Sequence, residues 1–255
     1  MEVTVEQRAA FARDGYVVIP GVVDRAHIDT ALQLINNWIY CGFDHERRVE
    51  YSAQTFGGDL PADDRIIALL ADTPVLDLAS RLVGRPIHYN KWAQIALRFP
   101  VPPGSAPFYP DVHIDGIPTD TNAVPEDGEI HGFTVIAGVL LSDVTGPDQG
   151  NFTVWPGSHL TMARWFAEHS PRIPDPHAFF AATKEVANAT SEPVQLTGRA
   201  GDVILAHHLT AHATGGHAGP HIRYAVFFRL FSDAREELGD AVYTDPWAEW
   251  DAMRA

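Results

Sequence analysis

The chain has 255 residues, a formal net charge of −15 and a hydrophobic content of 45%. This content allows a sizeable core, and the acidic balance argues against nucleic acid and anionic membranes as partners, because their phosphates repel such a chain. No run of about 18 apolar residues predicts a transmembrane helix. Cys41 is the only cysteine and the first 14 residues lack the apolar core of a signal peptide, so we expect a cytoplasmic protein.

The N-terminal third predicts helices joined by short connections. Thr4 and Gln7 stand three residues apart, as in a capping box, so we expect a helix to about Arg13 that ends near Gly15. A short β-branched strand should follow over 16–19. A second helix should start after Asp24, and two short helices should cover 63–70 and 74–82. We expect Thr73 to cap the last of these, with Pro74 at its first position and Gly84 at its end.

The segment from Cys41 to Pro61 is polar and lacks clear periodicity. It contains His45, Arg47 and Tyr51, side chains able to close over a ligand. Both a surface loop and a lid over a pocket agree with this pattern, and the sequence leaves the two interpretations open.

From residue 87 onward the hydrophobic period changes from helical to extended. Strand character is predicted for 87–99, 112–115, 133–141, 152–155, 194–197, 202–206 and 223–231, and helical character for 158–169 and part of 171–190. Many short strands separated by turns rich in Gly, Pro, Asp and Asn are typical of a barrel or sandwich. No internal repeat or clear linker divides the chain, so we expect one domain over 1–255, with a helical N-terminal third packed on a β-rich core.

His113 and Asp115 stand two residues apart, directly before Gly116. In a strand, both side chains would point to the same face and supply two ligands of one metal site. Arg223 opens an apolar strand far downstream, and an inward-pointing arginine there needs a partner anion. His207, His208 and His212 lie within six residues of one another and are all candidates for a third ligand.

These blocks resemble the phytanoyl-CoA dioxygenase-like branch of the iron(II)- and 2-oxoglutarate-dependent oxygenases. That branch carries an H-x-D block, an N-G block leading to P-G-S-H, a G-D block leading to H-x-x-x-x-H, and a trailing arginine. The counterparts here are, in chain order, His113-Ile114-Asp115, Gly150-Asn151, Pro156-Gly157-Ser158-His159, Gly201-Asp202, His207, His212 and Arg223. Four blocks in the family order, spread over most of the chain, make the resemblance specific.

The resemblance implies that His113, Asp115 and His212 bind Fe(II), which leaves three coordination positions for 2-oxoglutarate and O2. Arg223 and Thr214 would hold the distal carboxylate of 2-oxoglutarate, since arginine is a bidentate, permanently charged partner that lysine does not reproduce. In halogenating relatives a small residue replaces the carboxylate ligand. Asp115 therefore argues against halogenation.

His212 is preferred to its two neighbours because Thr214 then falls at the family offset. His207 is expected to be a packed or outer-sphere histidine. Ser158 and His159 are expected to terminate a turn and cap the next helix. Two residues depart from the family pattern. Val112 stands before the first ligand and Val139 stands beside the co-substrate, both at positions where the family often has an aromatic residue. These changes affect the shape of the pocket more than the metal chemistry.

The remaining site predictions concern the pocket. Arg98 stands where family members often place a group that contacts 2-oxoglutarate, although a surface ion pair is the alternative. Alternation along two predicted strands gives the expected substrate lining, on the condition that Gln94 and Val139 face inward. This lining consists of Asn90, Trp92, Gln94, His131 and Phe133.

These inferences predict a mainly β fold with flanking helices, a double-stranded β-helix of the jelly-roll, cupin-like type. The expected function is Fe(II)/2-oxoglutarate-dependent oxidation, usually hydroxylation, of a small organic metabolite such as a natural-product intermediate. The acidic balance argues against a coenzyme A thioester, whose phosphates favour a basic patch. A cupin-like metal-dependent isomerase or lyase and a non-catalytic binding module of the same fold are the alternatives.

Overall fold

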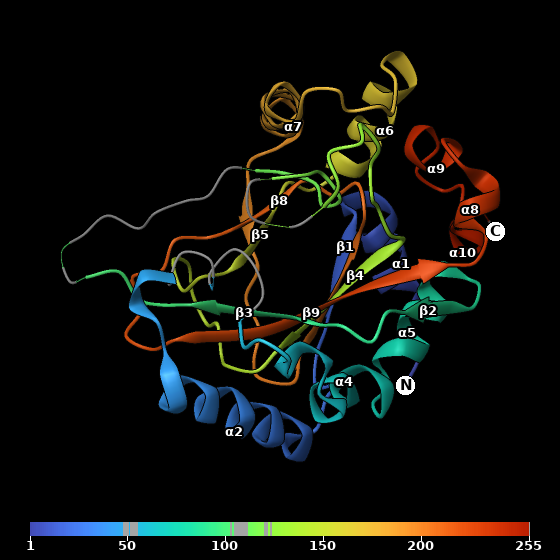
Figure 1. Ribbon diagram of the computed structural model, residues 1–255. Coiled ribbons are helices and arrows are strands. Elements are labelled where there is room, and N and C mark those ends of the chain that lie inside the picture. The colour runs from blue at the N-terminus through green and yellow to red at the C-terminus, as the bar shows by residue number, and fades with distance from the viewer. Residues whose placement is uncertain are drawn as a thin grey trace.

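The computed structural model describes residues 1–47, 51, 56–102, 104, 112–119, 122 and 124–254, and its main features are two antiparallel sheets with helices outside them (Figure 1). The α-helices are α1 (Val5–Asp14), α2 (Arg25–Gly42), α4 (Asp64–Ala71), α5 (Val75–Val83), α6 (Ser158–Glu168), α7 (Pro176–Thr190), α8 (Arg235–Leu238), α9 (Ala241–Thr244) and α10 (Asp251–Arg254), with 3-10 turns η1 (His45–Arg47) and η2 (Leu60–Ala62). The strands are β1 (Tyr16–Ile19), β2 (Ile87–Tyr89), β3 (Gln94–Arg98), β4 (Val135–Leu140), β5 (Phe152–Val154), β6 (Val194–Gln195), β7 (Val203–His207), β8 (His212–Thr214) and β9 (Arg223–Ser232). None of the described helices has the length and apolar content needed to span a bilayer.

The N-terminal helix begins and ends as its sequence predicts. The Thr4 hydroxyl accepts a hydrogen bond from the Gln7 amide at 3.1 Å, and the Gln7 side chain accepts one from the Thr4 amide at 2.9 Å, which completes the capping box. Gly15 ends α1 in the left-handed conformation, with φ of 82°. A Cβ there would also lie 2.5 Å from Nδ1 of His159, so only glycine fits this position.

Other helix ends agree with prediction in part. Asp24 caps α2 through a 3.1 Å hydrogen bond from the His27 amide, and Gly84 ends α5 in the left-handed conformation. The prediction that Thr73 caps the helix behind it is wrong, because Pro74 takes the cap position and α5 starts one residue later.

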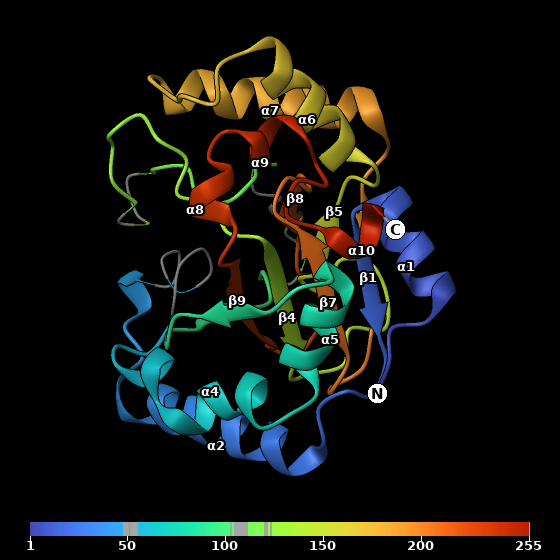
Figure 2. The same cartoon turned by 90° about the vertical axis from the view of Figure 1, so that its right-hand side faces the viewer.

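The two sheets face each other and lie between two groups of helices. The larger sheet has the strand order β1-β7-β4-β9-β2, with β3 also paired to β9, and the smaller sheet has the order β6-β5-β8. Helices α2, α4 and α5 cover the outer face of the larger sheet, while α6 and α7 lie beyond the smaller one (Figure 2). A separate apolar cluster, which includes Phe152, Ile204 and Phe227, fills part of the space between the sheets.

Strand β9 shows how side chains divide between these layers. Val226, Phe228 and Leu230 point into the core beneath the helices. The alternate residues Ala225 and Phe227 point toward the smaller sheet, and the same period carries Arg223 and Arg229 to that face. The face of β9 that carries Arg223 and Arg229 therefore lies between the two sheets. We call this face the floor of the candidate active site described below.

The prediction that Val139 faces the co-substrate is wrong. Val139 is fully buried in the helix-side core and pairs with Val226 of β9, which points the same way. Gly138 and Leu140 are the neighbours whose positions face the smaller sheet. The register follows from β4 pairing with both β7 and β9, a non-local choice that alternation alone leaves open.

The single strand predicted over 87–99 is also wrong, because the chain turns between β2 and β3. The Trp92 amide donates a 2.6 Å hydrogen bond to the Asn90 carbonyl within this break. Both strands pair with β9, β2 opposite residues 230–232 and β3 opposite residues 223–227. Alternation counted from Gln94 therefore does not extend back to residues 90–92.

Of the segment over 41–61, for which a surface loop and a lid are both open interpretations, residues 48–50 and 52–55 lie outside the described part of the chain. Two of its aromatic residues belong to the core, since Tyr51 and Phe56 are buried with their ring centroids 5.0 Å apart.

Candidate active site

His113, Asp115 and His212 converge on one point between the sheets. The prediction of a regular strand over 112–115 is wrong. His113 instead forms an isolated antiparallel bridge to His212 through backbone hydrogen bonds of 2.9 and 2.8 Å. One ligand atom from each of the three side chains lies within 4.8 Å of the others. Oδ1 of Asp115 is 3.6 Å from Nε2 of each histidine. Two imidazole nitrogens and one carboxylate oxygen in this arrangement match the donors preferred by non-haem iron.

A hydrogen bond orients the His212 ring. Its Nδ1 atom donates to the Thr210 carbonyl at 2.9 Å, so Nε2 is the ring nitrogen turned toward Asp115. The ring stacks on Phe152 with 5.0 Å between centroids, and its side chain is 7% exposed. The ligand is therefore held in position by the protein before any metal binds.

His207 lies away from this point and is packed, as expected. Its Nε2 atom donates to the Pro246 carbonyl at 2.7 Å, and its Nδ1 atom accepts from the Leu209 amide at 3.0 Å. His208 is buried beside it and donates to the Val242 carbonyl at 3.1 Å. Neither belongs to the group of side chains able to hold a metal among the described residues.

Asp115 is paired with an arginine that the sequence analysis missed. Arg229 approaches Oδ2 of Asp115 with Nη2 at 2.6 Å and Nε at 3.2 Å. Burial alone would raise the pKa of Asp115, but the Arg229 guanidinium, with His212 and His113, holds it well below the usual range. The signal in the sequence was position: Arg229 is six residues after Arg223, and an even spacing on a strand places both on one face.

A second pair of basic residues lies further along the same floor. Arg98 and Arg223 are direct cross-strand partners on β3 and β9. Burial lowers the pKa of Arg98 to about 10, and burial together with Arg98 lowers the pKa of Arg223 to about 9. Arg223 donates only to the carbonyls of Gly150 and Ala96, at 2.8 and 3.1 Å, and the Arg98 Nε atom has no partner among the described residues. Two desolvated guanidinium groups without a carboxylate partner among the described residues form a site for an anion.

Small side chains separate this cationic end from the metal ligands. Ala96 and Ala225 face each other across β3 and β9, two residue pairs from Arg98 and Arg223 and on the same face. Both belong to the cluster between the sheets. Both side chains are short and buried, and Phe227 follows on the same face of β9.

The family model described as phytanoyl-CoA dioxygenase matches residues 11–225, well over half of the chain. This chain belongs to the phytanoyl-CoA dioxygenase family. It is accordingly an enzyme, an iron(II)- and 2-oxoglutarate-dependent dioxygenase, and Fe(II) and 2-oxoglutarate are its cofactor and co-substrate. The family acts on small molecules.

Solved structures of similar fold agree with a double-stranded β-helix. The epimerase SnoN from nogalamycin biosynthesis is 22% identical with a TM-score of 0.62, covering 89% of this chain and 80% of its own. The carbocyclase SnoK from the same biosynthesis is 20% identical with a TM-score of 0.59, covering 89% and 83%. EctD from S. alaskensis, solved with 2-oxoglutarate and 5-hydroxyectoine, is 22% identical with a TM-score of 0.59, covering 90% and 76%. No curated protein sequence matches the chain.

In this phytanoyl-CoA dioxygenase family member, two of the predicted lining residues lie beside the metal ligands. The Gln94 side chain accepts a 2.6 Å hydrogen bond from Nη1 of Arg229, which in turn holds Asp115. The Phe133 ring lies under the same guanidinium, 5.9 Å from it. Their part in binding substrate remains a prediction.

Four other predicted residues are not brought to the ligand atoms by a contact in the described part of the chain. Asn90 is exposed and Trp92 is 52% exposed, both in the turn before β3. The His131 imidazole pairs with Asp127 at 3.1 Å. Thr214 lies opposite Phe152 on β8 and forms no hydrogen bond with Arg223, so its contact with the co-substrate remains a prediction.

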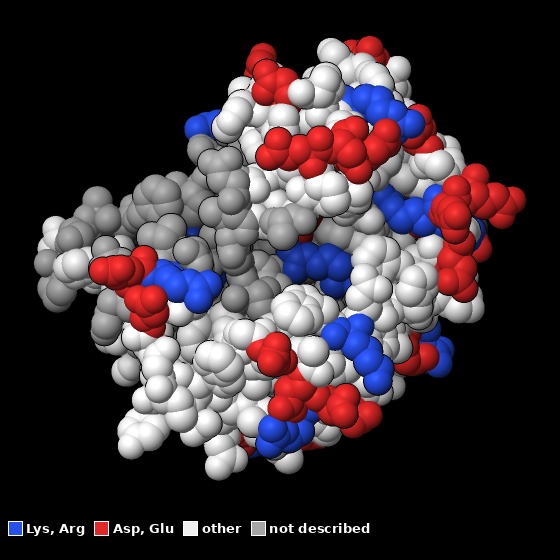
Figure 3. All heavy atoms as spheres, in the orientation of Figure 1, with Lys and Arg blue, Asp and Glu red and all other residues white. Residues whose placement is uncertain are grey.

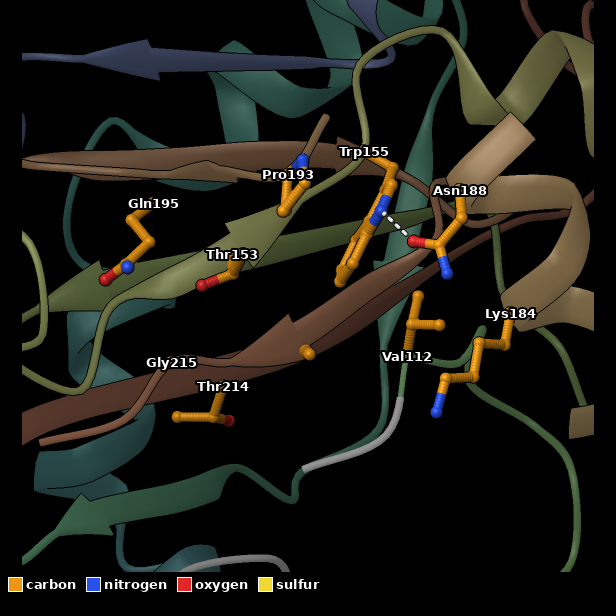
Figure 4. A pocket seen from close by; sticks show the side chains of 10 residues that line it. Val112, Thr153, Trp155, Lys184, Asn188, Pro193, Gln195, Thr214 and Gly215 are labelled. Carbon is orange, nitrogen blue, oxygen red and sulfur yellow. Dashed lines mark hydrogen bonds between the residues drawn. The ribbon is translucent and has the colours of Figure 1, made fainter. Parts of the chain in front are cut away.

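A cavity of about 310 Å³ opens on the outer face of the smaller sheet, away from the metal ligands (Figure 4). Thr153 and Ala213 line it, whereas their strand neighbours Phe152 and His212 point inward. On its far side, Trp155 donates a 3.0 Å hydrogen bond to Asn188 of α7. Thr214, the predicted co-substrate contact, also lines this cavity, as does Val112 beside His113.

Proposed function

We propose that the protein oxidises a small, free organic metabolite, of the natural-product-intermediate type, with Fe(II) bound by His113, Asp115 and His212. The observation that carries this proposal is the convergence of their three ligand atoms within 4.8 Å, with Nδ1 of His212 already bonded to a backbone carbonyl. When bound, the iron supplies the activation of O2 that is coupled to oxidative decarboxylation of 2-oxoglutarate to succinate and CO2. Hydroxylation is the outcome we propose for the substrate.

Arg223, with Arg98 beside it, is proposed to bind the distal carboxylate of 2-oxoglutarate. The supporting observation is the burial of both cations without a carboxylate partner among the described residues, next to the short side chains of Ala96 and Ala225. A guanidinium offers parallel donors to a carboxylate, so it also sets the direction of the bound molecule. The other end of 2-oxoglutarate would then point along the floor toward the metal ligands.

The substrate class is proposed from the walls on the metal side. Phe133 offers an aromatic face, and Gln94 and Arg229 offer polar atoms, which together suit a compact, partly oxygenated molecule. Figure 3 shows basic side chains inside a recess of one face and acidic ones spread over the surrounding surface. Two of the similar structures come from nogalamycin biosynthesis and one binds 5-hydroxyectoine, all small-molecule chemistry.

The test begins with binding and then turns to reaction. The protein purified without metal should bind one Mn(II) or Fe(II), and 2-oxoglutarate should bind more tightly once the metal is present. Incubation with Fe(II), 2-oxoglutarate, O2 and pooled small metabolites should give succinate in step with a product 16 mass units heavier than its precursor, as hydroxylation requires. Metal binding that persists unchanged in a His113→Ala protein would refute the assignment of the site.

A further inference from the structure

Arg229 uses two of its nitrogens on a single oxygen of Asp115. Nη2 and Nε approach Oδ2 at 2.6 and 3.2 Å, and neither donates to Oδ1. The third nitrogen, Nη1, donates to the Gln94 side chain at 2.6 Å. This differs from the usual parallel pairing of a guanidinium with a carboxylate, in which each oxygen accepts one hydrogen bond. Arg229 therefore occupies Oδ2 and leaves Oδ1 free of the guanidinium.

The free oxygen is the one that faces the histidines. Oδ1 of Asp115 lies 3.6 Å from Nε2 of both His113 and His212. We propose that Arg229 is a positioning residue that restricts Asp115 to one-oxygen coordination of the metal. The proposal rests on the proposed function, since it takes these three side chains as the metal ligands.

The restriction matters because coordination positions are limited. A six-coordinate ion with three protein ligand atoms keeps three open positions, and 2-oxoglutarate bound through two atoms plus O2 needs all of them. A carboxylate is able to supply both oxygens to one ion. If Asp115 did so, one of the three open positions would be lost. Arg229 prevents this by holding Oδ2.

The surroundings of Arg229 favour a fixed guanidinium. Its side chain is only 29% exposed, and the Phe133 ring lies 5.9 Å from it. Gln94 is on β3, which pairs with β9 through five residues, so this contact joins two neighbouring strands. Lysine would bring a cation but only one nitrogen to this point.

The experiment counts the water molecules on bound Mn(II), which fill the open positions when co-substrate is absent. Longitudinal relaxation of water protons scales with this number, so it reports coordination without turnover. Loss of one position out of three in Arg229→Met should lower the inner-sphere relaxivity by about a third. Arg229→Lys should fall between Arg229→Met and the unchanged protein. Arg81→Met removes an exposed arginine paired with Asp77 at 2.7 Å, and serves as the matched control with unchanged relaxivity.

Two further results decide the proposal. If Arg229→Met folds with unchanged thermal unfolding but does not bind Mn(II), Arg229 is needed for metal binding itself and the restriction to one oxygen is overturned. If Arg229→Met does not fold, Arg229→Gln is measured in its place. Mn(II) bound with the relaxivity of the unchanged protein would overturn the proposal. If in addition His113→Ala abolishes Mn(II) binding, the proposed function stands and only the role of Arg229 fails.

Discussion

At the scale of single residues, hydrogen bonds decide which histidine is able to bind a metal. His212 uses Nδ1 on the Thr210 carbonyl and keeps Nε2 free beside Asp115. His207 uses both nitrogens, one on the Pro246 carbonyl and one on the Leu209 amide. Five positions apart in the sequence, the two imidazoles thus have different roles.

The first prediction follows from this difference. His212→Ala should lower Mn(II) affinity by at least about a hundredfold, because loss of an outer-sphere partner alone costs roughly 10–100-fold. His207→Ala should leave affinity within about threefold while lowering the free energy of unfolding, since it leaves a cavity in a packed region. Isothermal titration and urea unfolding measure the two effects. The opposite pattern would make His207 the third ligand.

The second prediction concerns the cationic end of the site. Arg223→Lys should weaken 2-oxoglutarate binding by roughly 2–3 kcal/mol, or about 30–150-fold, because a planar pair of donors to the carboxylate is lost. Mn(II) affinity should be unchanged, since the three ligand side chains remain. Titration of 2-oxoglutarate into the Mn(II)-loaded protein measures this. Arg13→Lys, at a side chain that is 70% exposed, is the control, and equal affinities in the two variants would contradict the assignment of Arg223.

At the scale of elements, the turn that precedes β5 packs against Arg98 and Arg223. Gly150 has φ of +74°, and a Cβ there would lie 2.8 Å from Cβ of Arg98 and 3.4 Å from Cβ of Arg223. Its carbonyl accepts the hydrogen bond from Nε of Arg223 at 2.8 Å. The turn before β5 therefore links the smaller sheet to the basic pair on the larger one.

The third prediction is that Gly150→Ala will destabilise the protein and weaken co-substrate binding together. The positive φ costs an alanine about 1–2 kcal/mol, and the close contact with Arg98 adds to it. Urea unfolding and 2-oxoglutarate titration measure both effects. Gly146→Ala is the matched control, because a Cβ there would lie 3.6 Å from Nε2 of Gln149, an ordinary contact. Normal 2-oxoglutarate affinity in Gly150→Ala would show that this turn does not set the geometry of the basic pair.

At the scale of the whole molecule, buried histidines couple the packing of the layers to pH. His159, His207 and His208 form one group, with ring centroids 5.3 and 4.4 Å apart along it. Burial lowers the pKa of His159 to about 4, and burial with neighbouring positive charge lowers the pKa of His207 and His208 well below the usual value. The folded protein thus keeps all three neutral where an unfolded chain would protonate them.

The fourth prediction follows from that linkage. Between about pH 6.5, the ordinary histidine pKa, and about pH 4, the unfolded state binds more protons, so the free energy of unfolding falls as pH falls. Each histidine contributes up to about 1.4 kcal/mol per pH unit. Urea unfolding at pH 7.5, 6.5 and 5.5 measures how steeply the free energy of unfolding changes with pH. His159→Gln should reduce this pH dependence by about the contribution of one histidine. An unfolding free energy that is constant over this range would contradict the prediction.

The sequence by itself determined the features that rest on local chemistry. The capping box at Thr4 and the left-handed end at Gly15 need only neighbouring residues to form. The helix predicted from Ser158 also forms, but the prediction that Ser158 and His159 cap it is wrong, because Gly157 takes the cap position without a side-chain hydrogen bond. The order of the blocks around His113, Asp115 and His212 likewise indicated the ligand set and the family, because non-haem Fe(II) oxygenases bind their metal with two histidines and one carboxylate.

Only the tertiary structure decided what depends on the pairing of distant strands. The register of β4 between β7 and β9 turns Val139 away from the site, and the break before β3 removes Trp92 from the face of Gln94. The hydrogen bonds from Arg229 to Asp115 join residues 114 positions apart. The alternation of side chains along a strand divides them between two faces, but it does not say which face lies between the sheets. That choice depends on backbone hydrogen bonds between distant strands and on the helices that cover one side of the sheet.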